Sequence, residues 1–283
     1  MKKNYFNVKR YVNSKFLKPV ILGAAVVMVV GSLAGCGSSA EKNSATPGVT
    51  EVNVGVGSTF PPYAYIGEDN KPAGYDVAVL KEVNKRLPQY KFNYQSIELK
   101  NLLISLDSKK VQIATQQFEK NPSRLEKYLF TKEGFSNYDK RIVFAKGRTG
   151  IKTIDDLAGK RVGASQGSNT AAILEKFNQE HDNKINIVYT TGGSNVIYDD
   201  VVNGRLDAII QTRKVFNKYN KEFGNGLDIV EDSLFSKSDA YYILGKNEEQ
   251  LRDDIDTALR AMKKDGTLSK ISYEYTNSDY VSE

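Results

Sequence analysis

Hydrophobic residues in this chain recur with two alternating periods, one near two residues and one near 3.6. The shorter period predicts strands over residues 52–56, 91–95 and 111–115, and the longer one predicts helices over residues 76–87 and 100–109. The resulting order is strand, helix, strand, helix, strand. Such an order favours a parallel sheet with helices on its faces.

A second unit of the same kind begins after a strand-like segment at residues 142–145. The pattern predicts helices over residues 154–157, 168–177 and 194–203 and strands over residues 161–164, 185–189 and 206–210. A further strand at 240–244 and an amphipathic helix around residues 251–262 form a tail that could return to the first unit. The fold class predicted is therefore α/β with two lobes and two crossings. Ligands of open α/β sheets bind at the carboxyl ends of the strands, so facing lobes would create a cleft.

Asn121 and Pro122 mark a helix start between the two units. Asn can cap free backbone amides, and Pro fits the first helical position, where its missing N–H costs nothing. Arg124 would then lie in the first turn of a helix that we expect to run through Leu125 and Leu129.

The charge of the chain is concentrated at its N-terminus. There are 40 Lys and Arg residues against 34 Asp and Glu, but six of the basic residues and no acidic one fall within residues 1–35. These are followed by an apolar run at residues 19–30, too short for a bilayer span of about 20 residues, and then by small residues up to Cys36. This layout predicts a secretory signal peptide over residues 1–35. The neutral remainder gives no reason to expect a nucleic-acid partner.

The counts of cysteine and histidine exclude several kinds of site. A single cysteine cannot form an intramolecular disulfide, and one histidine, His181, cannot form a histidine metal cluster. We therefore expect no metal and no cofactor. Residues 36–49 are small and polar and predict a flexible tether.

Two familiar motifs are present only in weak form. Ser165 stands in a Gly-x-Ser-x-Gly pattern at a strand-to-helix turn, but a serine nucleophile needs a base, and His181 lies in a polar run expected to be a solvated turn. The glycines at Gly55 and Gly57 begin a dinucleotide fingerprint that lacks its third glycine. Neither motif supports an enzymatic prediction.

A more coherent set of residues suits a small zwitterion. Arg124 could hold a carboxylate with two parallel hydrogen bonds. The amides of Ser168 and Asn169 would open a helix and be free to bind an anion. Phe60, after the first strand, could pack against the ligand's side chain. Each of these residues alone has an ordinary structural explanation, such as an Arg124 ion pair with Glu126 or Glu133.

Here the sequence resembles a known family, the solute-binding lipoproteins of ATP-binding-cassette (ABC) importers for polar amino acids. The resemblance runs from Cys36 to the final helix and is carried by residues 60–65 (FPPYAY), 74–79 (GYDVAV), 120–130 (KNPSRLEKYLF), 155–163 (DDLAGKRVG), 166–168 (QGS), 204–208 (GRLDA) and 264–267 (KDGT). Residues 117–124 look most like the cystine and sulfur amino acid branch. Residues 33–36 resemble a lipobox, which implies that Cys36 carries a diacylglycerol and palmitate-type anchor.

The resemblance implies a periplasmic-binding-protein-like fold. Two α/β lobes would be joined by a two-stranded hinge, with lobe 1 over residues 50–143 plus 243–283 and lobe 2 over residues 144–242. Phe60 and Leu99 would pack against the ligand's side chain, while Arg124, assisted by the backbone at Ser168, would hold its α-carboxylate. Gln117, Asn169 and Thr212 are included among the expected ligand-binding residues.

Two positions depart from the family's pattern. Thr212 stands where members often have an ammonium-binding Asp, and Glu119 stands where they often have Ser or Thr. We hypothesise that Glu119 replaces the missing Asp. The alternative is that Glu119 points to solvent beside Lys120.

The function implied is that of an extracytoplasmic, membrane-anchored, monomeric receptor. It would bind an amino acid, with L-cystine the best guess, and deliver it to the permease and ATPase subunits of an ABC importer. Three alternatives remain: a ligand such as glutamine, histidine or arginine; a cyclohexadienyl-dehydratase-like enzyme on the same fold, with Glu119 as acid or base; and a surface adhesin or sensor.

Overall fold

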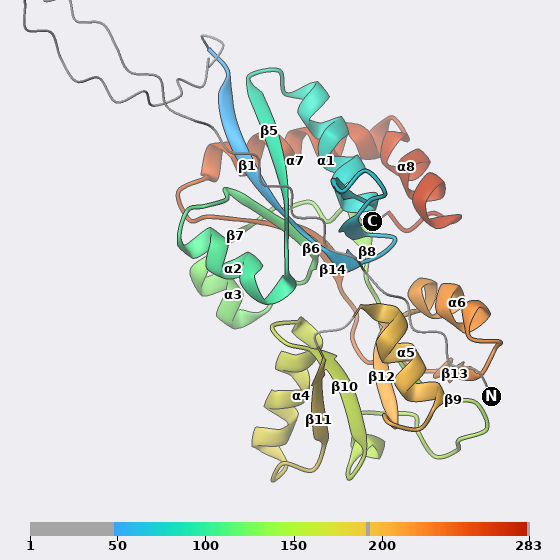
Figure 1. Cartoon of the computed structure of the whole chain (residues 1–283). Helices are drawn as coiled ribbons and strands as arrows, with labels where there is room; N and C mark the ends of the chain where they lie inside the picture. Colours follow the sequence, from blue (N-terminus) through green and yellow to red (C-terminus); the bar gives the residue numbers. More distant parts are fainter. Residues whose placement is uncertain (1–47, 191–192, 282–283) are drawn as a thin grey trace, which may run out of the picture. The chain divides into compact units, whose positions relative to one another are not determined.

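The structure is a computed structural model, and it describes residues 48–190 and 193–281 (Figure 1). The expected signal peptide, Cys36 and nearly all of the expected tether lie outside these residues. The described chain forms a mixed α/β fold with two main sheets and one small three-stranded sheet. No helix within the described residues is both long enough and apolar enough to cross a bilayer.

The first sheet belongs to lobe 1 and has the strand order β5-β1-β6-β14-β7, with β8 paired to β14. Its strands are β1 (Thr50–Gly57), β5 (Tyr90–Ile97), β6 (Ile113–Phe118), β7 (Leu129–Phe130), β8 (Ser136–Asn137) and β14 (Asp239–Leu244). As predicted, β1, β5 and β6 are parallel. Strand β14 runs antiparallel to β6. The small sheet of β2 (Thr59–Phe60), β3 (Ala64–Ile66) and β4 (Pro72–Ala73) follows β1.

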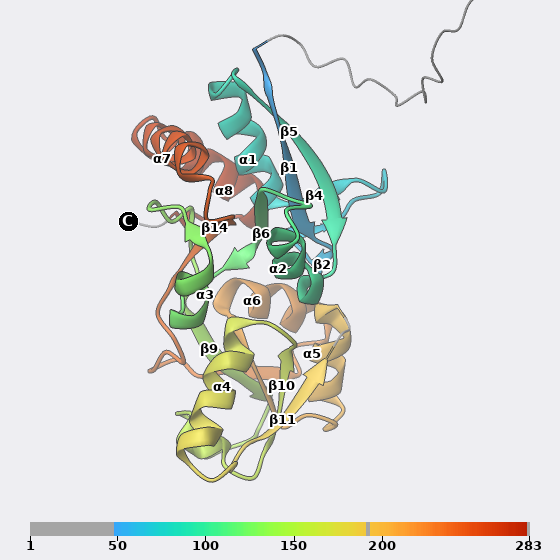
Figure 2. The same ribbon diagram turned by 90° about the vertical axis from the view of Figure 1, so that its left-hand side faces the viewer.

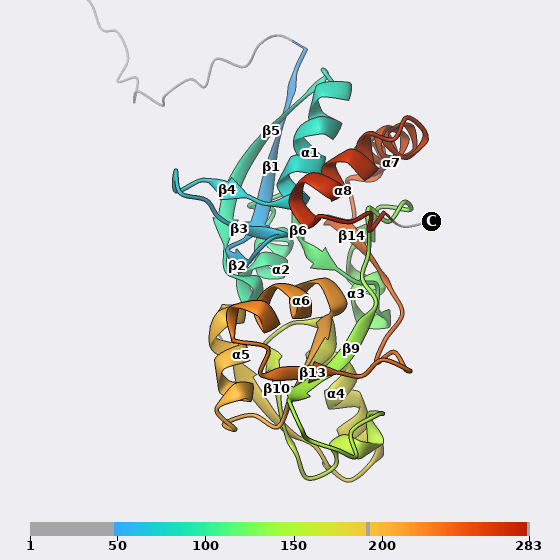
Figure 3. The ribbon, with the colours of Figure 1, turned by 90° about the vertical axis from the view of Figure 1, so that its right-hand side faces the viewer.

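Helices cover both faces of this sheet (Figures 1 and 3). They are α1 (Tyr75–Arg86), α2 (Leu99–Asp107), α3 (Pro122–Lys127), α7 (Glu249–Lys264) and α8 (Thr267–Thr276). Val52, Val54 and Val56 point to one face, into a hydrophobic cluster that includes α1, α7 and α8. Gly55 faces α2 on the other side, where an added Cβ would lie 3.0 Å from Leu102. The alternating side chains of β1 thus pack against different helices on the two faces of the sheet.

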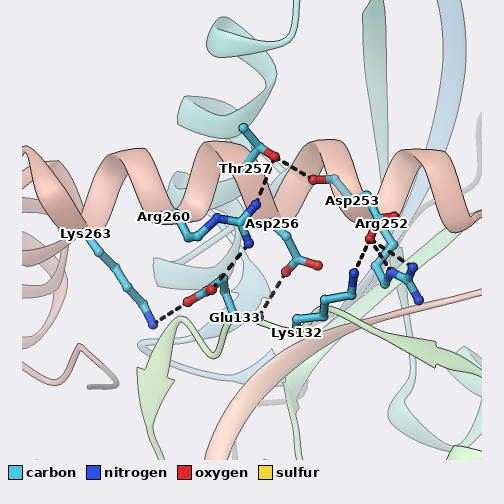
Figure 4. Close-up of polar contacts among 8 residues, drawn as sticks. All are labelled: Lys132, Glu133, Arg252, Asp253, Asp256, Thr257, Arg260 and Lys263. Carbon is cyan, nitrogen blue, oxygen red and sulfur yellow. Dashed lines mark hydrogen bonds and ion pairs between the residues drawn. The ribbon is translucent and has the colours of Figure 1, made fainter.

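A polar network fixes α7 to the loop after β7 (Figure 4). The buried Asp256 carboxylate accepts a hydrogen bond from the Glu133 backbone N–H at 2.9 Å. Glu133 in turn pairs with Arg260 and Lys263. Burial raises the pKa of Asp256, and the backbone hydrogen bonds oppose that rise. The returning tail is therefore attached to the first sheet by a specific contact as well as by its apolar face.

The second sheet belongs to lobe 2 and has the strand order β11-β10-β12-β9-β13. Its strands are β9 (Lys140–Ala145), β10 (Arg161–Ser165), β11 (Asn186–Thr190), β12 (Ala208–Thr212) and β13 (Leu227–Ile229). The 3-10 turn η1 (Asp155–Leu157) precedes β10. Helix α4 (Asn169–Glu180) covers one face (Figure 2), and α5 (Ser194–Val202) and α6 (Arg213–Glu222) cover the other (Figure 3).

The two lobes are joined by antiparallel segments that precede β9 and β14. The backbone N–H of Tyr138 donates to Ser238 O at 2.8 Å, and that of Lys140 donates to Ser236 O at 2.9 Å. The crossings expected at 143/144 and 242/243 fall inside β9 and β14, and each of these strands belongs whole to one sheet. Both crossings between the lobes therefore lie a few residues earlier in the chain than expected. All of β9 pairs within the sheet of lobe 2, and all of β14 pairs within the sheet of lobe 1.

One further expectation needs correction, and one helix was not expected. The helix expected to run from Asn121 through Leu129 ends at Lys127, and Leu129 starts β7, which pairs with β14. Helix α6 was not predicted; its Val215, Phe216 and Tyr219 are buried among polar residues.

Candidate ligand-binding site

A cavity of about 100 Å³ lies between the two lobes. Strand ends and helix starts of both lobes line it, as expected for α/β lobes that face each other. Seven of the eight predicted binding residues are among the lining residues: Phe60, Leu99, Gln117, Glu119, Arg124, Ser168 and Asn169.

Arg124 reaches across the cleft. Its position follows from the predicted start of α3, where the Asn121 side chain accepts the Arg124 backbone N–H at 2.9 Å and Pro122 is the first helical residue. Nη1 donates to Glu119 O at 2.9 Å in lobe 1, and Nη2 donates to Gly167 O at 2.8 Å in lobe 2. A guanidinium has five N–H donors, so donors remain for a ligand. Burial lowers the pKa of Arg124, and the nearby Glu119 carboxylate opposes that shift.

The start of α4 contributes Ser168 and Asn169 to the lining of the cavity. Ser168 is the N-cap of α4, and its hydroxyl accepts the Ala171 N–H at 3.1 Å. The Ser168 N–H donates to Ser165 O at 3.1 Å, so this amide is not free, contrary to expectation. Asn169 Oδ1 accepts a hydrogen bond from Asn121 Nδ2 at 2.9 Å, which is a second contact between the lobes.

Glu119 is buried, with 2% of its surface exposed, and does not point to solvent beside Lys120. One carboxylate oxygen is paired with the Lys140 ammonium, which also donates to Thr170 Oγ1 at 3.0 Å. The other oxygen, Oε1, has no hydrogen-bond partner among the residues that the structure describes. Lys140 could not be predicted as a site residue, because nothing in its β-rich segment distinguishes it from an ordinary surface lysine at a strand end.

Gln117 is held in place by a network behind the cavity. The buried Asp76 carboxylate accepts hydrogen bonds from Gln117 N at 3.0 Å, from Gln117 Nε2 at 2.7 Å and from Thr115 Oγ1 at 2.7 Å. Burial raises the pKa of Asp76 to about 6, against the lowering effect of these bonds. Gln117 has φ 49°, a left-handed conformation that costs energy in a non-glycine residue. Its Oε1 also lacks a partner within the described ranges.

Aromatic rings form one wall of the cavity. The Phe60 ring lies 5.2 Å from that of Tyr63 and 6.5 Å from that of Tyr138, which approaches edge-on. Phe60 and Tyr138 line the cavity together with Ile197 of lobe 2. Leu99, the first residue of α2, lines it from lobe 1.

Thr212 is not part of the lining, although its neighbour Gln211 is. Its hydroxyl caps α6 by accepting the Val215 N–H at 3.4 Å, and it also hydrogen-bonds to the Tyr63 side chain of lobe 1. The Thr212 hydroxyl is therefore engaged as the cap of α6, and a ligand-binding role for this residue stays a prediction.

His181 does not lie beside Ser165 as the imidazole of a catalytic pair would. Helix α4 separates Ser165 from His181, and its twelve residues span about 18 Å. His181 caps the far end of α4 and stacks on Phe177 at 4.0 Å. Among the described residues, no group of three or more His, Cys, Asp or Glu side chains could hold a metal.

Comparison with known proteins identifies the class to which this fold and cleft belong. Residues 52–278 match the bacterial extracellular solute-binding proteins, family 3, and the chain belongs to that family. Its members are binding proteins that act outside the cytoplasm, as the family's description states.

Particular relatives are similar over nearly their whole length. The L-cystine-binding protein TcyK of Bacillus subtilis is 34% identical over 265 residues, or 92% of this chain and 96% of that relative. The L-cystine-binding protein TcyJ of the same organism is 32% identical over 258 residues, or 91% and 96%. A solved structure described as a putative L-cystine ABC transporter from Listeria monocytogenes superposes with a TM-score of 0.76 at 37% identity, covering 83% of this chain and 99% of that one.

Proposed function

We propose that this protein binds a free amino acid between its lobes and presents it to an ABC importer. The observation that carries this proposal is that one cavity is lined by both charges a free amino acid needs, the Arg124 guanidinium and the Glu119 carboxylate with its unpartnered Oε1. Arg124 would receive the α-carboxylate through its remaining N–H donors. Glu119 and Gln117 would accept hydrogen bonds from the α-ammonium. The second carboxylate oxygen of Glu119 stays paired with Lys140.

The ligand that we propose is L-cystine or a related sulfur amino acid. This rests on the names of the relatives and on the apolar wall of Phe60, Tyr138 and Leu99, which suits a thioether or disulfide. Glutamine, histidine and arginine are the competing ligands.

Titration calorimetry and thermal unfolding of the mature protein with each amino acid test the proposal. A ligand at a hundredfold excess over its Kd should stabilise the fold by about 2.7 kcal/mol. Cystine should give the largest shift. A larger shift with glutamine, histidine or arginine would overturn the ligand, and no shift with any amino acid would overturn the function.

Delivery to an importer would follow from closure of the lobes. Only the closed state lets both lobes contact one ligand, so binding favours that state, which a permease could recognise. Uptake of labelled cystine should fall in cells that lack this chain and recover when it is restored. Unchanged uptake would contradict the proposed delivery.

We also propose that Cys36 carries the lipid anchor and that the anchored protein is a monomer. A Cys36→Ser chain should lose fatty-acid labelling and move from the membrane fraction to the soluble fraction. Membrane retention of this variant would argue against the anchor. Light scattering of the lipid-free mature chain tests the monomer.

We propose that the bound ligand leaves unchanged. Glu119, the residue considered as acid or base, is already engaged by Lys140. Incubation with cyclohexadienyl amino acid precursors should yield no product, and dehydration of such a precursor would favour the enzyme instead.

A further inference from the structure

A second cavity of about 110 Å³ adjoins the first. The two share four lining residues: Thr59, Leu99, Gln116 and Ser165. The second cavity is also formed by both lobes, since Ser58, Glu98 and Lys100 come from lobe 1 and Gln166 and Thr190 from lobe 2. The space for a ligand therefore continues past the cavity that holds Arg124.

The size of the second cavity matches a polar head group. One water occupies about 10–15 Å³ of such a cavity, so there is room for several waters, comparable to an ammonium and a carboxylate on one carbon. Apart from Leu99, the lining side chains are hydroxyls, amides and one pair of opposite charges, with Lys100 Nζ 3.0 Å from a Glu98 carboxylate oxygen. Lys100 and Glu98 keep 47% and 62% of their side-chain surface exposed and can reorient toward a ligand.

The wall between the cavities carries a further acceptor. The Gln116 side chain lies directly over Gly57, where any Cβ would come within 1.7 Å of Gln116 Oε1. That oxygen is buried and has no hydrogen-bond partner in the described part of the chain. Buried acceptors are normally hydrogen-bonded, so a donor on a ligand that extends from one cavity into the other would satisfy this oxygen.

We propose that the second cavity binds the far amino acid head of an elongated disulfide ligand, with Lys100 meeting its second carboxylate and Glu98 its second ammonium. This inference rests on the proposed function and names the ligand class, a bis-amino acid disulfide. A disulfide holds its two Cα atoms about 5.5–6 Å apart, so the second head must sit next to the first. The shared lining of the two cavities meets that requirement.

Four ligands distinguish the contributions of the near and the far head group. L-Cystine has both heads, and S-methyl-L-cysteine has no far head. The mixed disulfide of cysteine with 3-mercaptopropionate has only the far carboxylate, and the one with cysteamine has only the far ammonium. Kd values from calorimetry at one salt concentration give the comparison.

Two charge variants and one size variant probe the cavity. Lys100→Ala should weaken cystine and the mercaptopropionate disulfide about three- to tenfold and leave the other two ligands within about twofold. Glu98→Gln should weaken cystine and the cysteamine disulfide by a similar factor. Thr190→Leu should fill the cavity and weaken all three disulfides but not S-methyl-L-cysteine. Lys110→Ala, an exposed lysine outside both cavities, is the control.

The outcomes distinguish this inference from the proposed function. If the wild-type chain binds none of the four ligands, the sulfur amino acid proposal fails with it. If it binds cystine but Lys100→Ala and Thr190→Leu leave the ratio of the cystine and S-methyl-L-cysteine Kd values unchanged, only the second subsite is overturned. A uniform loss across all four ligands would also overturn it.

Discussion

Glu119 and Lys140 form a buried ion pair at the edge of the cavity, and neither residue can be changed alone without a second effect. Glu119 is 2% and Lys140 5% exposed. Removing one partner of such a pair leaves an uncompensated charge, which costs about 3–5 kcal/mol, whereas replacing both can be nearly neutral. A loss of binding in Glu119→Gln would therefore mix loss of the ammonium contact with loss of the fold.

The double variant Glu119→Gln/Lys140→Met separates these effects. We expect each single variant to lower the free energy of unfolding by about 3–5 kcal/mol and the double variant to recover most of that loss. The double variant should still bind the amino acid at least about tenfold more weakly, because the ammonium has lost its anion. Urea unfolding and calorimetry measure the two quantities. Wild-type affinity in a stable double variant would show that Glu119 does not hold the ammonium.

Arg124→Lys tests the geometry of the carboxylate site. A lysine keeps the charge but cannot make two parallel hydrogen bonds, and it cannot bridge Glu119 O and Gly167 O as the guanidinium does. We expect affinity to fall at least about tenfold. Arg205→Lys, on the exposed surface of lobe 2, is the matched control and should leave the Kd unchanged. Equal Kd values for wild type and Arg124→Lys would remove Arg124 from the binding site.

At the scale of elements, the attachment of helix α7 to the loop after β7 includes one buried hydrogen-bond acceptor, the Asp256 carboxylate. The Asp256 carboxylate, 1% exposed, satisfies the Glu133 N–H. Asp256→Ala should destabilise the protein by about 1–3 kcal/mol, because it leaves that buried donor without a partner. Asp253→Ala, which removes an exposed pair with Lys132, should cost about 1 kcal/mol or less. Urea unfolding of the two variants should show this order, and equal losses would contradict the role of Asp256.

The elements that could be predicted from the sequence are those whose periodicity reflects a single dominant neighbour. Helices α1, α2 and α7 bury one clear face each, and the capped start of α3 follows from Asn121 and Pro122. The end of α3 could not be predicted, because Leu129 is recruited by pairing to β14, a strand more than 100 residues away. Helix α6 was missed because its buried apolar residues are spaced among seven charged or amide side chains.

The candidate site likewise contains residues that local sequence patterns locate and residues that they do not. Arg124, Ser168 and Phe60 stand at element ends, where local patterns locate them. Lys140 could not be found in this way, because its partner Glu119 comes from the other lobe. The sequence alone could not show that Thr212 caps α6, because a Thr at a strand end suits a binding site and a helix cap equally well. Contacts made between lobes leave no periodic signal in the sequence.

At the scale of the whole receptor, the contacts that cross the cleft determine how closure responds to conditions. Lys214 on α6 of lobe 2 is buried against lobe 1, with its Nζ 4.7 Å from the centre of the Tyr63 ring and 5.2 Å from that of Tyr280. This Nζ makes no hydrogen bond within residues 48–190 and 193–281. Burial lowers its pKa from an ordinary 10.5 to about 7, and Asp76 of lobe 1 partly opposes that shift.

The direction of the pH effect follows from where each group is buried. Lys214 is desolvated by residues of lobe 1, so opening the cleft should restore its pKa to the ordinary value, and closing should release a proton. Closure should then become more favourable as pH rises above about 7, by at most about tenfold per pH unit, and show no slope from this group below that value. Burial raises the pKa of Asp76 to about 6, and the hydrogen bonds that lower it come from Thr115 and Gln117 of its own lobe. Lys214 of lobe 2 is the smallest of the causes, so closure changes the titration of Asp76 less than folding does.

Ligand affinity between pH 6 and 8.5 tests this account, because the closed state is the one that binds. In the wild type, affinity should be nearly flat up to about pH 7 and then rise, and Lys214→Met should remove the rise by removing the titrating amine. Lys218→Met changes an exposed lysine one turn further along α6 and should keep the wild-type profile. Titration of the ligand itself affects all three proteins equally, so the difference between the two variants isolates Lys214. If Lys214→Met retained the wild-type slope, the burial of this amine would not be coupled to closure.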